Sequence, residues 1–283
     1  MHLKFTKMHG LGNDFLVLEL VTQHFEISPE LIQKWGDRRT GIGFDQLLVV
    51  HPPSNPKTDF RYQIFNVDGT EVQQCGNGAR CIAKYVSHVG LTIKKSLQME
   101  ALGGIVHTSI LDDIADGPYT SIVRVGMGIP CTKPSAIPFL ADEPAINYVI
   151  NTGSQDIEFV PLSIGNPHAV IIVDNVNDAP ITEWGQALQT NNRFPEGVNV
   201  GFMQIVDRQF VRLRVFERGV GETLACGTGA CAGVVAGHLL GKLDDRVKVS
   251  LPGGKVRVMW PGESSMVEMT GPATWVYDGE LRT

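Results

Sequence analysis

The stretch Cys75-Gly76-Asn77-Gly78-Ala79-Arg80-Cys81 decides how the rest of this chain is interpreted. A cysteine stands directly before a glycine-rich turn, and the turn runs into an apolar segment that is typical of a helix. A thiol at a helix N-terminus meets unpaired backbone N–H groups and the positive end of the helix dipole, which favour a thiolate and bind anions. A single cysteine in this context is more often a buried thiol than a catalytic one.

The same pattern occurs a second time, at Cys226-Gly227-Thr228-Gly229-Ala230-Cys231. A purely structural cysteine has no reason to keep the same helix-start context twice. The duplication therefore favours a functional role for Cys75 and Cys226, in two half-sites that face each other. Cys81 and Cys231 fall about one turn into their helices, so we expect them to pack in the core.

Other landmarks repeat at nearly the same offset, which predicts two similar halves. The fold class expected from them is α+β, with two similar domains related by a pseudo-two-fold axis. The matched landmarks are Leu11-Gly12-Asn13 with Ile164-Gly165-Asn166, the helix 31–38 with the helix 184–189, Gly43-Phe44-Asp45-Gln46 with Glu196-Gly197-Val198-Asn199, Arg61–Phe65 with Arg212–Phe216, and Gly103-Gly104 with Gly253-Gly254.

The proline-rich stretch 124–138 is the expected boundary between the halves. We predict a first domain of residues 1–123 plus 272–283, which carries Cys75, and a second of residues 124–271, which carries Cys226. The last segment, 275–281, is strand-like and is expected to return and pair with the first domain. Ser28 before a proline and a glutamate predicts the N-cap of the first helix.

Bulk composition narrows the class of protein. The chain of 283 residues is 43% hydrophobic and 19% charged, with a net charge of −6, so a nucleic-acid partner is not expected. We see neither a membrane-spanning apolar run nor a secretion signal. Five cysteines form an odd count that favours reduced thiols and a cytoplasmic location. Cys131, in the proline-rich stretch, is expected to be incidental.

Two helix-capping cysteines across a shared cleft are suited to acid–base chemistry at carbon. One thiolate removes a proton, and the opposite thiol donates a proton to the other face, which inverts the centre. The reference pKa of a thiol, about 8.5, is lowered at a helix N-terminus, and a base works best with a pKa near ambient pH. Backbone N–H groups would hold a carboxylate beside that carbon and stabilise the developing negative charge. These N–H groups belong to Gly76, Asn77, Gly227 and Thr228.

Polar side chains at turn positions surround the two motifs. Together they offer amides, a carboxylate and a guanidinium, which are the partners that an amino-acid ligand requires. The set comprises Asn13, Gln46, Asn66, Asn166, Asn199, Glu217 and Arg218, with His168 two residues after Asn166. Each member also has a plainer interpretation, because asparagine is common in turns. His168 would then be a buried core histidine, and Glu217-Arg218 an ion pair at a strand end.

Two other classes of function stay open at this stage. Clustered cysteines suggest a metal or redox site, but the spacings Cys-x5-Cys and Cys-x4-Cys do not fit the usual zinc or Cys-x-x-Cys motifs. Twin domains around a cleft also suit a non-catalytic amino-acid binding module. Replacement of Cys75 and Cys226 by alanine separates the binding module from an enzyme, since a binder keeps its affinity and an epimerase loses turnover.

The sequence closely resembles the diaminopimelate epimerase family, nearly from end to end. The resemblance rests on 9–15 (HGLGNDF), on Asn66-x-Asp68-Gly69 before the first cysteine motif, and on Gly165-Asn166-Pro167-His168. It continues through 217–223 (ERGVGET) into the second motif and ends in Val276-Tyr277-Asp278-Gly279.

The resemblance implies two domains, each with a central helix wrapped by strands, and a cofactor- and metal-free epimerase of 2,6-diaminopimelate. It makes Cys75 and Cys226 the acid–base pair, and the seven turn residues with the four backbone N–H groups the substrate site. His168 and Glu217 would tune the thiol pKa values, and Tyr277 would lie near a homodimer contact. The related proline racemase group, and an isomerase group without the cysteines, remain alternatives. Glu217-Arg218 favours a ligand charged at both ends.

Overall fold

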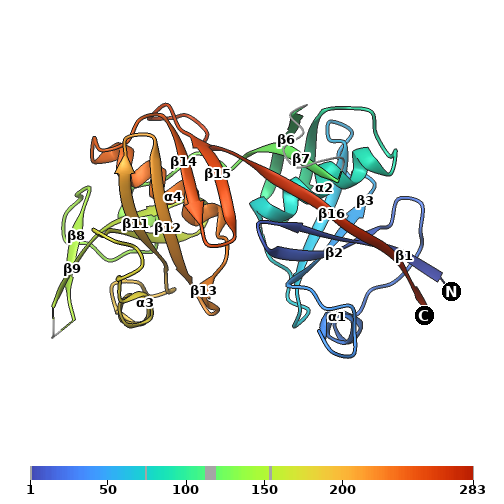
Figure 1. The fold of residues 1–283 in the computed structure, drawn as a ribbon, viewed down its shortest axis with the longest axis horizontal. Helices are drawn as coiled ribbons and strands as arrows, with labels where there is room; N and C mark the ends of the chain where they lie inside the picture. The colour runs from blue at the N-terminus through green and yellow to red at the C-terminus, as the bar shows by residue number, and fades with distance from the viewer. Residues whose placement is uncertain (1, 74, 112–118, 153–154, 283) are drawn as a thin grey trace. The chain divides into compact units, whose positions relative to one another are not determined.

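The computed structural model describes residues 2–73, 75–111, 119–152 and 155–282. The chain forms two compact units, residues 1–126 with 270–283, and residues 127–269. In each unit, strands surround one long helix, which is α2 (Gly76–His88) in the first unit and α4 (Gly227–Leu239) in the second (Figure 1). The expectation of a helix wrapped by strands, made for each half, is confirmed.

The first unit is a closed ring of strands around α2. Its strand order is β1 to β7 followed by β16, and β16 also pairs with β1. The last segment of the chain therefore returns to the first unit as predicted, with Leu3 opposite Leu281 and Lys7 opposite Tyr277. The other elements are β1 (His2–Gly10), β2 (Asn13–Glu19), α1 (Pro29–Gly36), β3 (Gln46–His51), β4 (Phe60–Asn66), β5 (Ser96–Ala101), β6 (Gly104–Leu111), β7 (Thr120–Gly126) and β16 (Glu268–Arg282).

The strands of the second unit also lie around a central helix, α4. Its strand order is β8-β9-β10-β11-β12-β14-β15, with the short β13 paired to β12. The elements are η1 (Pro134–Ala136), β8 (Tyr148–Asn151), β9 (Asp156–Ser163), β10 (Pro167–Ile172), α3 (Ile181–Gln189), β11 (Asn199–Asp207), β12 (Phe210–Glu217), β13 (Gly221–Thr223), β14 (Arg246–Leu251) and β15 (Gly254–Met259).

Strand register repeats with the sequence landmarks. In the parallel pair β2–β3, Phe15 lies opposite Gln46, and in the parallel pair β10–β11, His168 lies opposite Asn199. The turns that enter β2 and β10 each contain a glycine with left-handed backbone angles. These are Gly12 and Gly165, and both have a φ of 84°. The two central helices are each 13 residues long. The predicted internal repeat is thus present in the secondary structure of both units.

Helix α1 begins as predicted but ends earlier. The side chain of Ser28 accepts a hydrogen bond from the N–H of Leu31, and Ile32 and Trp35 are buried. The sequence prediction extended this helix to Arg38, which is wrong, since the helix ends at Gly36. Asp37 leaves the helical region with ψ of 123°, and its carboxylate accepts hydrogen bonds from the next backbone N–H groups.

Each unit has its own apolar core, to which the second cysteine of each motif contributes. Cys81 and Cys231 are fully buried, so their predicted packing in the core is confirmed. Cys131 is half-buried and exchanges backbone hydrogen bonds with Ser163. Among the residues described, no helix is both long and apolar enough to span a bilayer.

Candidate active site

Each of the two predicted catalytic cysteines is the N-cap of a central helix. The sulfur of Cys75 accepts a hydrogen bond from the N–H of Gly78 at 3.4 Å, and the sulfur of Cys226 accepts one from Gly229 at 3.4 Å. Both cysteines have extended backbone angles, as an N-cap residue requires. The thiols therefore occupy the same position in each unit, at the positive end of the helix.

The fourth residue of each motif is a glycine that lies close to the sheet. A Cβ atom on Gly78 would approach Leu48 on β3 to 3.0 Å, and one on Gly229 would approach Val215 on β12 to 2.9 Å. Real Cβ atoms rarely approach other atoms so closely. The glycine thus lets the start of the helix, with its capping sulfur, lie directly against the sheet.

In the first unit, amide side chains gather around Cys75. The distance from the sulfur of Cys75 to Oδ1 of Asn13 is 3.8 Å, and Nδ2 of Asn77 donates to the same oxygen at 3.4 Å. Gln46 donates to Oδ1 of Asn66 at 3.0 Å, which joins the ends of β3 and β4. The structure therefore brings Asn13 and Asn77 to the thiol and pairs Gln46 with Asn66.

In the second unit, Cys226 is more enclosed. The residue is only 5% exposed, and its sulfur lies 3.5 Å from the hydroxyl oxygen of Thr228. Asn166 donates to that hydroxyl at 3.4 Å, and Oδ1 of Asn166 lies 3.0 Å from Nε2 of His168. A continuous set of polar contacts thus runs from the thiol to the buried imidazole.

Glu217 and Arg218, adjacent at the end of β12, have different partners. The carboxylate of Glu217 accepts hydrogen bonds from the hydroxyl of Thr223 and from the thiol of Cys226. The backbone N–H of Arg218 donates to Oδ1 of Asn199 at 3.0 Å, and its guanidinium donates to the carbonyl of Glu196 at 2.7 Å. The alternative interpretation of these two residues as a strand-end ion pair is therefore not what the structure shows.

Burial and a nearby carboxylate set the ionisation of Cys226. Burial raises the pKa of the Cys226 thiol well above its usual range, and the negative charge of Glu217 raises it further. Burial also raises the pKa of Glu217 itself. The sequence-based expectation of a lowered thiol pKa is therefore wrong for Cys226. The helix N-terminus is outweighed here, and this residue is a protonated thiol at neutral pH.

His168 is a buried, neutral imidazole. Burial lowers its pKa to about 3, and the positive charge of Arg218 acts in the same direction. The side chain is fully buried, and its Nδ1 atom has no hydrogen-bond partner in the described part of the chain. It contacts the site through its hydrogen bond to Asn166.

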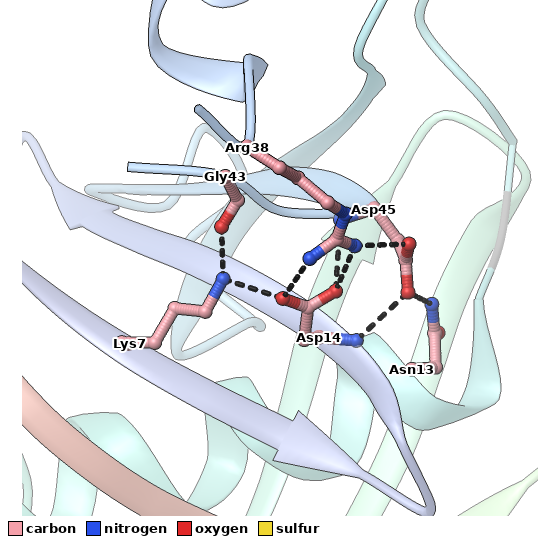
Figure 2. A network of polar contacts seen from close by, with 6 residues as sticks. All are labelled: Lys7, Asn13, Asp14, Arg38, Gly43 and Asp45. Atoms are coloured by element: carbon pink, nitrogen blue, oxygen red, sulfur yellow. Dashed lines mark hydrogen bonds and ion pairs between the residues drawn. The ribbon is translucent and has the colours of Figure 1, made fainter. Parts of the chain in front are cut away.

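A charged network behind Asn13 was not predicted from the sequence (Figure 2). Arg38 bridges Oδ1 of Asp14 and Oδ1 of Asp45, each at 2.7 Å, and Lys7 contacts Asp14 at 2.5 Å and the carbonyl of Gly43. Burial would raise the pKa of Asp14, but the hydrogen bonds from Arg38 and Lys7 outweigh it and hold that pKa well below its usual range.

The repeat itself contained a signal for this network. By the alignment of the two halves, Asp14 and Asp45 correspond to Pro167 and Val198 in the second half. Two carboxylates thus stand beside predicted site residues where the other half has apolar residues. Among described residues, no cluster of three or more His, Cys, Asp or Glu side chains is placed to hold a metal ion.

Solved structures of other proteins share this architecture. The fold is similar to that of a hydroxyproline epimerase from Agrobacterium vitis, with a TM-score of 0.72, 14% identity, and coverage of 99% of this chain and 92% of that one. It is also similar to a phenazine biosynthesis protein of the PhzF family from Bacillus anthracis, with a TM-score of 0.69, 17% identity and full coverage of both chains. At such low identity the likeness defines the fold alone.

Sequence comparison is much more specific. The profile of the diaminopimelate epimerase family matches residues 5–131 and 160–276. Diaminopimelate epimerases from Azotobacter vinelandii and Pseudomonas aeruginosa are 54% and 52% identical to this chain over 282 residues, with full coverage of each protein. The chain therefore belongs to the diaminopimelate epimerase family.

Proposed function

We propose that this chain is an isomerase that interconverts LL- and meso-2,6-diaminopimelate without a cofactor, in the synthesis of lysine and of peptidoglycan precursors. The observation that carries the proposal is the twice-built cysteine N-cap, in a chain 51–54% identical to named diaminopimelate epimerases over its whole length. The fold alone would suit several racemases, so the identity decides the substrate.

The proposed mechanism uses Cys75 and Cys226 on opposite faces of one α-carbon. In the direction where Cys226 acts as the acid, the thiolate of Cys75 removes the α-proton, and the thiol of Cys226 supplies a new proton on the other side. The raised pKa of Cys226 supports this resting assignment, because it leaves that thiol with its proton. In the reverse direction the roles exchange: the thiolate of Cys226 removes the α-proton and the thiol of Cys75 supplies one, and Glu217 accepts the S–H hydrogen bond of Cys226 once that thiol is protonated.

Carbanion formation requires stabilisation of negative charge on the substrate carboxylate. The first two residues of each central helix are Gly76-Asn77 and Gly227-Thr228. The first N–H groups of a helix have no partner within it, so they are suited to bind this carboxylate and the charge that develops on it. Hydrogen-bond donors fixed before the reaction contribute most, since they need not reorient.

The distal end of the substrate would be held by the unequal polar residues. Arg218 suits the distal carboxylate and Glu217 an ammonium group, with amides from both units completing the shell. The amides are Asn13, Gln46, Asn66, Asn166 and Asn199. This set favours a ligand charged at both ends, which diaminopimelate is and proline is not.

Deuterium exchange tests the proposal directly. In D2O the enzyme should place solvent deuterium at the α-carbon of LL-diaminopimelate and leave L-proline unlabelled. Labelling of proline alone would overturn the substrate assignment. Binding of diaminopimelate without labelling would favour a non-catalytic binding module, and loss of activity on removal of a stoichiometric zinc ion would favour metal chemistry.

The assembly and location are further parts of the proposal. We take residues 1–123 with 272–283 and residues 124–271 as the two domains, a homodimer as the assembly and the cytoplasm as the location. Tyr277 would lie near the dimer contact, and it supports this because 44% of it is exposed while its ring packs edge-on against Phe5. Sedimentation analysis tests the dimer, and a monomer at micromolar concentration would contradict it.

A further inference from the structure

Asn13 lies between the charged network and Cys75. Its Nδ2 donates to Oδ2 of Asp45 at 3.2 Å, while its Oδ1 faces the sulfur of Cys75 and accepts from Asn77. An amide has one donor end and one acceptor end, so the direction in which it points decides what the sulfur meets. In this structure the sulfur meets an acceptor.

A carboxylate fixes that direction from one side. Asp45 accepts from three donors, which are the side chain of Asn13, the backbone N–H of Asp14 at 3.1 Å and Arg38 at 2.7 Å. An ionised carboxylate can only accept hydrogen bonds. The NH2 group of Asn13 must therefore point toward Asp45 (Figure 2). This turns its oxygen toward the thiol of Cys75.

An arginine fixes the neighbouring amide from the other side. Arg80 on α2 is fully buried and donates to Oδ1 of Asn77 at 2.8 Å and to the carbonyl of Pro272 at 3.1 Å. A guanidinium can only donate, so Asn77 presents its NH2 group to Asn13. The two ends of the chain of hydrogen bonds thus require the same orientation of Asn13.

We infer that Asp45 is a positioning residue that keeps the amide oxygen of Asn13 turned toward Cys75. Arg38 supports it by holding the second carboxylate oxygen. The consequence for the reaction rests on the proposed function. The oxygen accepts the S–H group of a protonated Cys75 when the residue acts as an acid, and offers an acceptor to the substrate ammonium when the thiol is ionised.

Asparagine at position 45 cannot replace the carboxylate. It offers one oxygen and one NH2 group, whereas the donors around Asp45 occupy both oxygens. If its oxygen faces Arg38, its NH2 group meets the NH2 group of Asn13, and this repulsion favours turning Asn13 over against the long 3.4 Å contact from Asn77. The turned amide would present an N–H group to the sulfur of Cys75, where it stabilises a thiolate.

The test measures how the alkylation rate of Cys75 by iodoacetamide depends on pH. Cys226 and the half-buried Cys131 are first replaced by alanine, so that Cys75 is the accessible thiol. In this parent, Asp45→Asn should move the midpoint of alkylation to lower pH by about one unit, which is a tenfold change in the ionisation constant. An unchanged midpoint would overturn the inference.

Two titratable groups that interact electrostatically with Cys75 do not interfere. They are Tyr62 on β4 and Cys81 on α2, and both pKa values are raised mainly by burial, that of Cys81 to about 12. Both groups stay neutral over the range tested. Arg80 stays positively charged throughout, and it is unchanged by the substitution.

A matched control and a double-mutant cycle separate positioning from a general structural effect. Asp59 also accepts from a cation and a backbone N–H, which are Lys94 at 2.6 Å and Gln98 at 2.8 Å. Asp59→Asn should leave the midpoint in place. In an Asn13→Ala background, Asp45→Asn should cause no further shift, and a shift of the same size there would refute a role through Asn13.

Turnover gives a second readout with Cys75 and Cys226 intact. Asp45→Asn should lower kcat for diaminopimelate about tenfold, less than the roughly 10²- to 10⁴-fold contribution of an acid–base group itself, because Cys75 remains in place. Asp59→Asn should not lower it. The alkylation shift needs no turnover. If the shift occurs while no diaminopimelate is processed, the substrate assignment fails and the positioning role stands.

Discussion

The half-site around Cys75 and the half-site around Cys226 share a backbone and differ in their charges. Cys75 is half-buried, with amides beside it and an ionic network behind them. Cys226 is buried next to a carboxylate and is linked to a neutral imidazole. Duplication of the scaffold thus supplied two equivalent thiol positions, while the surrounding residues gave the two thiols different environments.

The central helices differ in the same way. Arg80 in α2 is fully buried and holds side-chain and backbone acceptors of the first unit, whereas the equivalent position in α4 is Cys231. Helix α4 contains no Asp, Glu, Lys or Arg, and nine of its residues are buried. The central helix of the first unit therefore contributes a buried charge near its site, and the central helix of the second unit does not.

Removal of the thiol from either half-site should have the largest effect on activity. Cys75→Ala and Cys226→Ala should each lower epimerisation of diaminopimelate about 10³-fold, since general acid–base groups contribute 10² to 10⁴. The measurement is the initial rate from each of the two isomers. Cys131→Ala is the control and should retain activity. Comparable turnover in both directions by either site variant would refute the two-base scheme.

Neutralising Glu217 should make the two thiols more alike. Glu217→Gln removes the anion that raises the pKa of Cys226, so the alkylation midpoint of that thiol should move to lower pH. Activity should fall about tenfold or more, as expected when a charged hydrogen-bond partner is lost. Glu222→Gln, which breaks an ion pair with Arg214 at 2.6 Å on the neighbouring strand, is the control. A midpoint that stays in place would contradict the role given to Glu217.

His168→Phe converts a position of the second half to its counterpart Phe15. The pKa of His168 is about 3 in the folded chain, against the ordinary value of 6.5 for a histidine. Between these values the unfolded chain therefore binds one more proton than the folded chain. Stability of the native protein should therefore fall as pH drops below 6.5, and this part of the dependence should vanish in the variant. Urea unfolding at about pH 7.5 and about pH 5 measures this pH dependence of the free energy of unfolding. His107 is exposed, so His107→Phe is the control. An equal change in unfolding free energy between the two pH values in the native protein and in His168→Phe would exclude the effect.

The smallest expected effect concerns the peripheral helices. Ser28 caps α1 through its side chain, whereas α3 has no side-chain cap. Ser28→Ala should cost about 1 kcal/mol of unfolding free energy. Thr182→Ala, in the exposed first turn of α3, should change it by less than about 0.5 kcal/mol. Equal losses would show that the two helix starts are equivalent.

Much of the fold could be predicted because its signals are local or repeated. The two cysteine N-caps, the start of α1 and the return of 275–281 to the first unit each follow from short patterns. The predicted end of α1 was two residues too late. The helix does not continue through Asp37, because the side chain of this residue accepts hydrogen bonds from the backbone N–H groups that follow it.

The chemistry of the sites was less predictable, because it depends on contacts between distant segments. Arg38 and Asp45 each resemble an ordinary surface charge in the sequence, and only the fold brings them together behind Asn13. The raised pKa of Cys226 likewise depends on the burial of Glu217 beside it. The sequence predicts a helix N-terminus at Cys226, but it does not show whether the helix N-terminus or the burial beside Glu217 dominates the pKa of the thiol.

Pairing of β16 with β1 also has a consequence for the order in which the chain folds. The second unit is one continuous segment, residues 127–269, whereas the first needs residues 270–283 to close its ring. During synthesis the Cys226 unit can therefore complete its core first. Until β16 arrives, β1 keeps an open edge, and Pro272, which accepts from the buried Arg80, is missing. On the ribosome, the half that begins the chain is the last to mature.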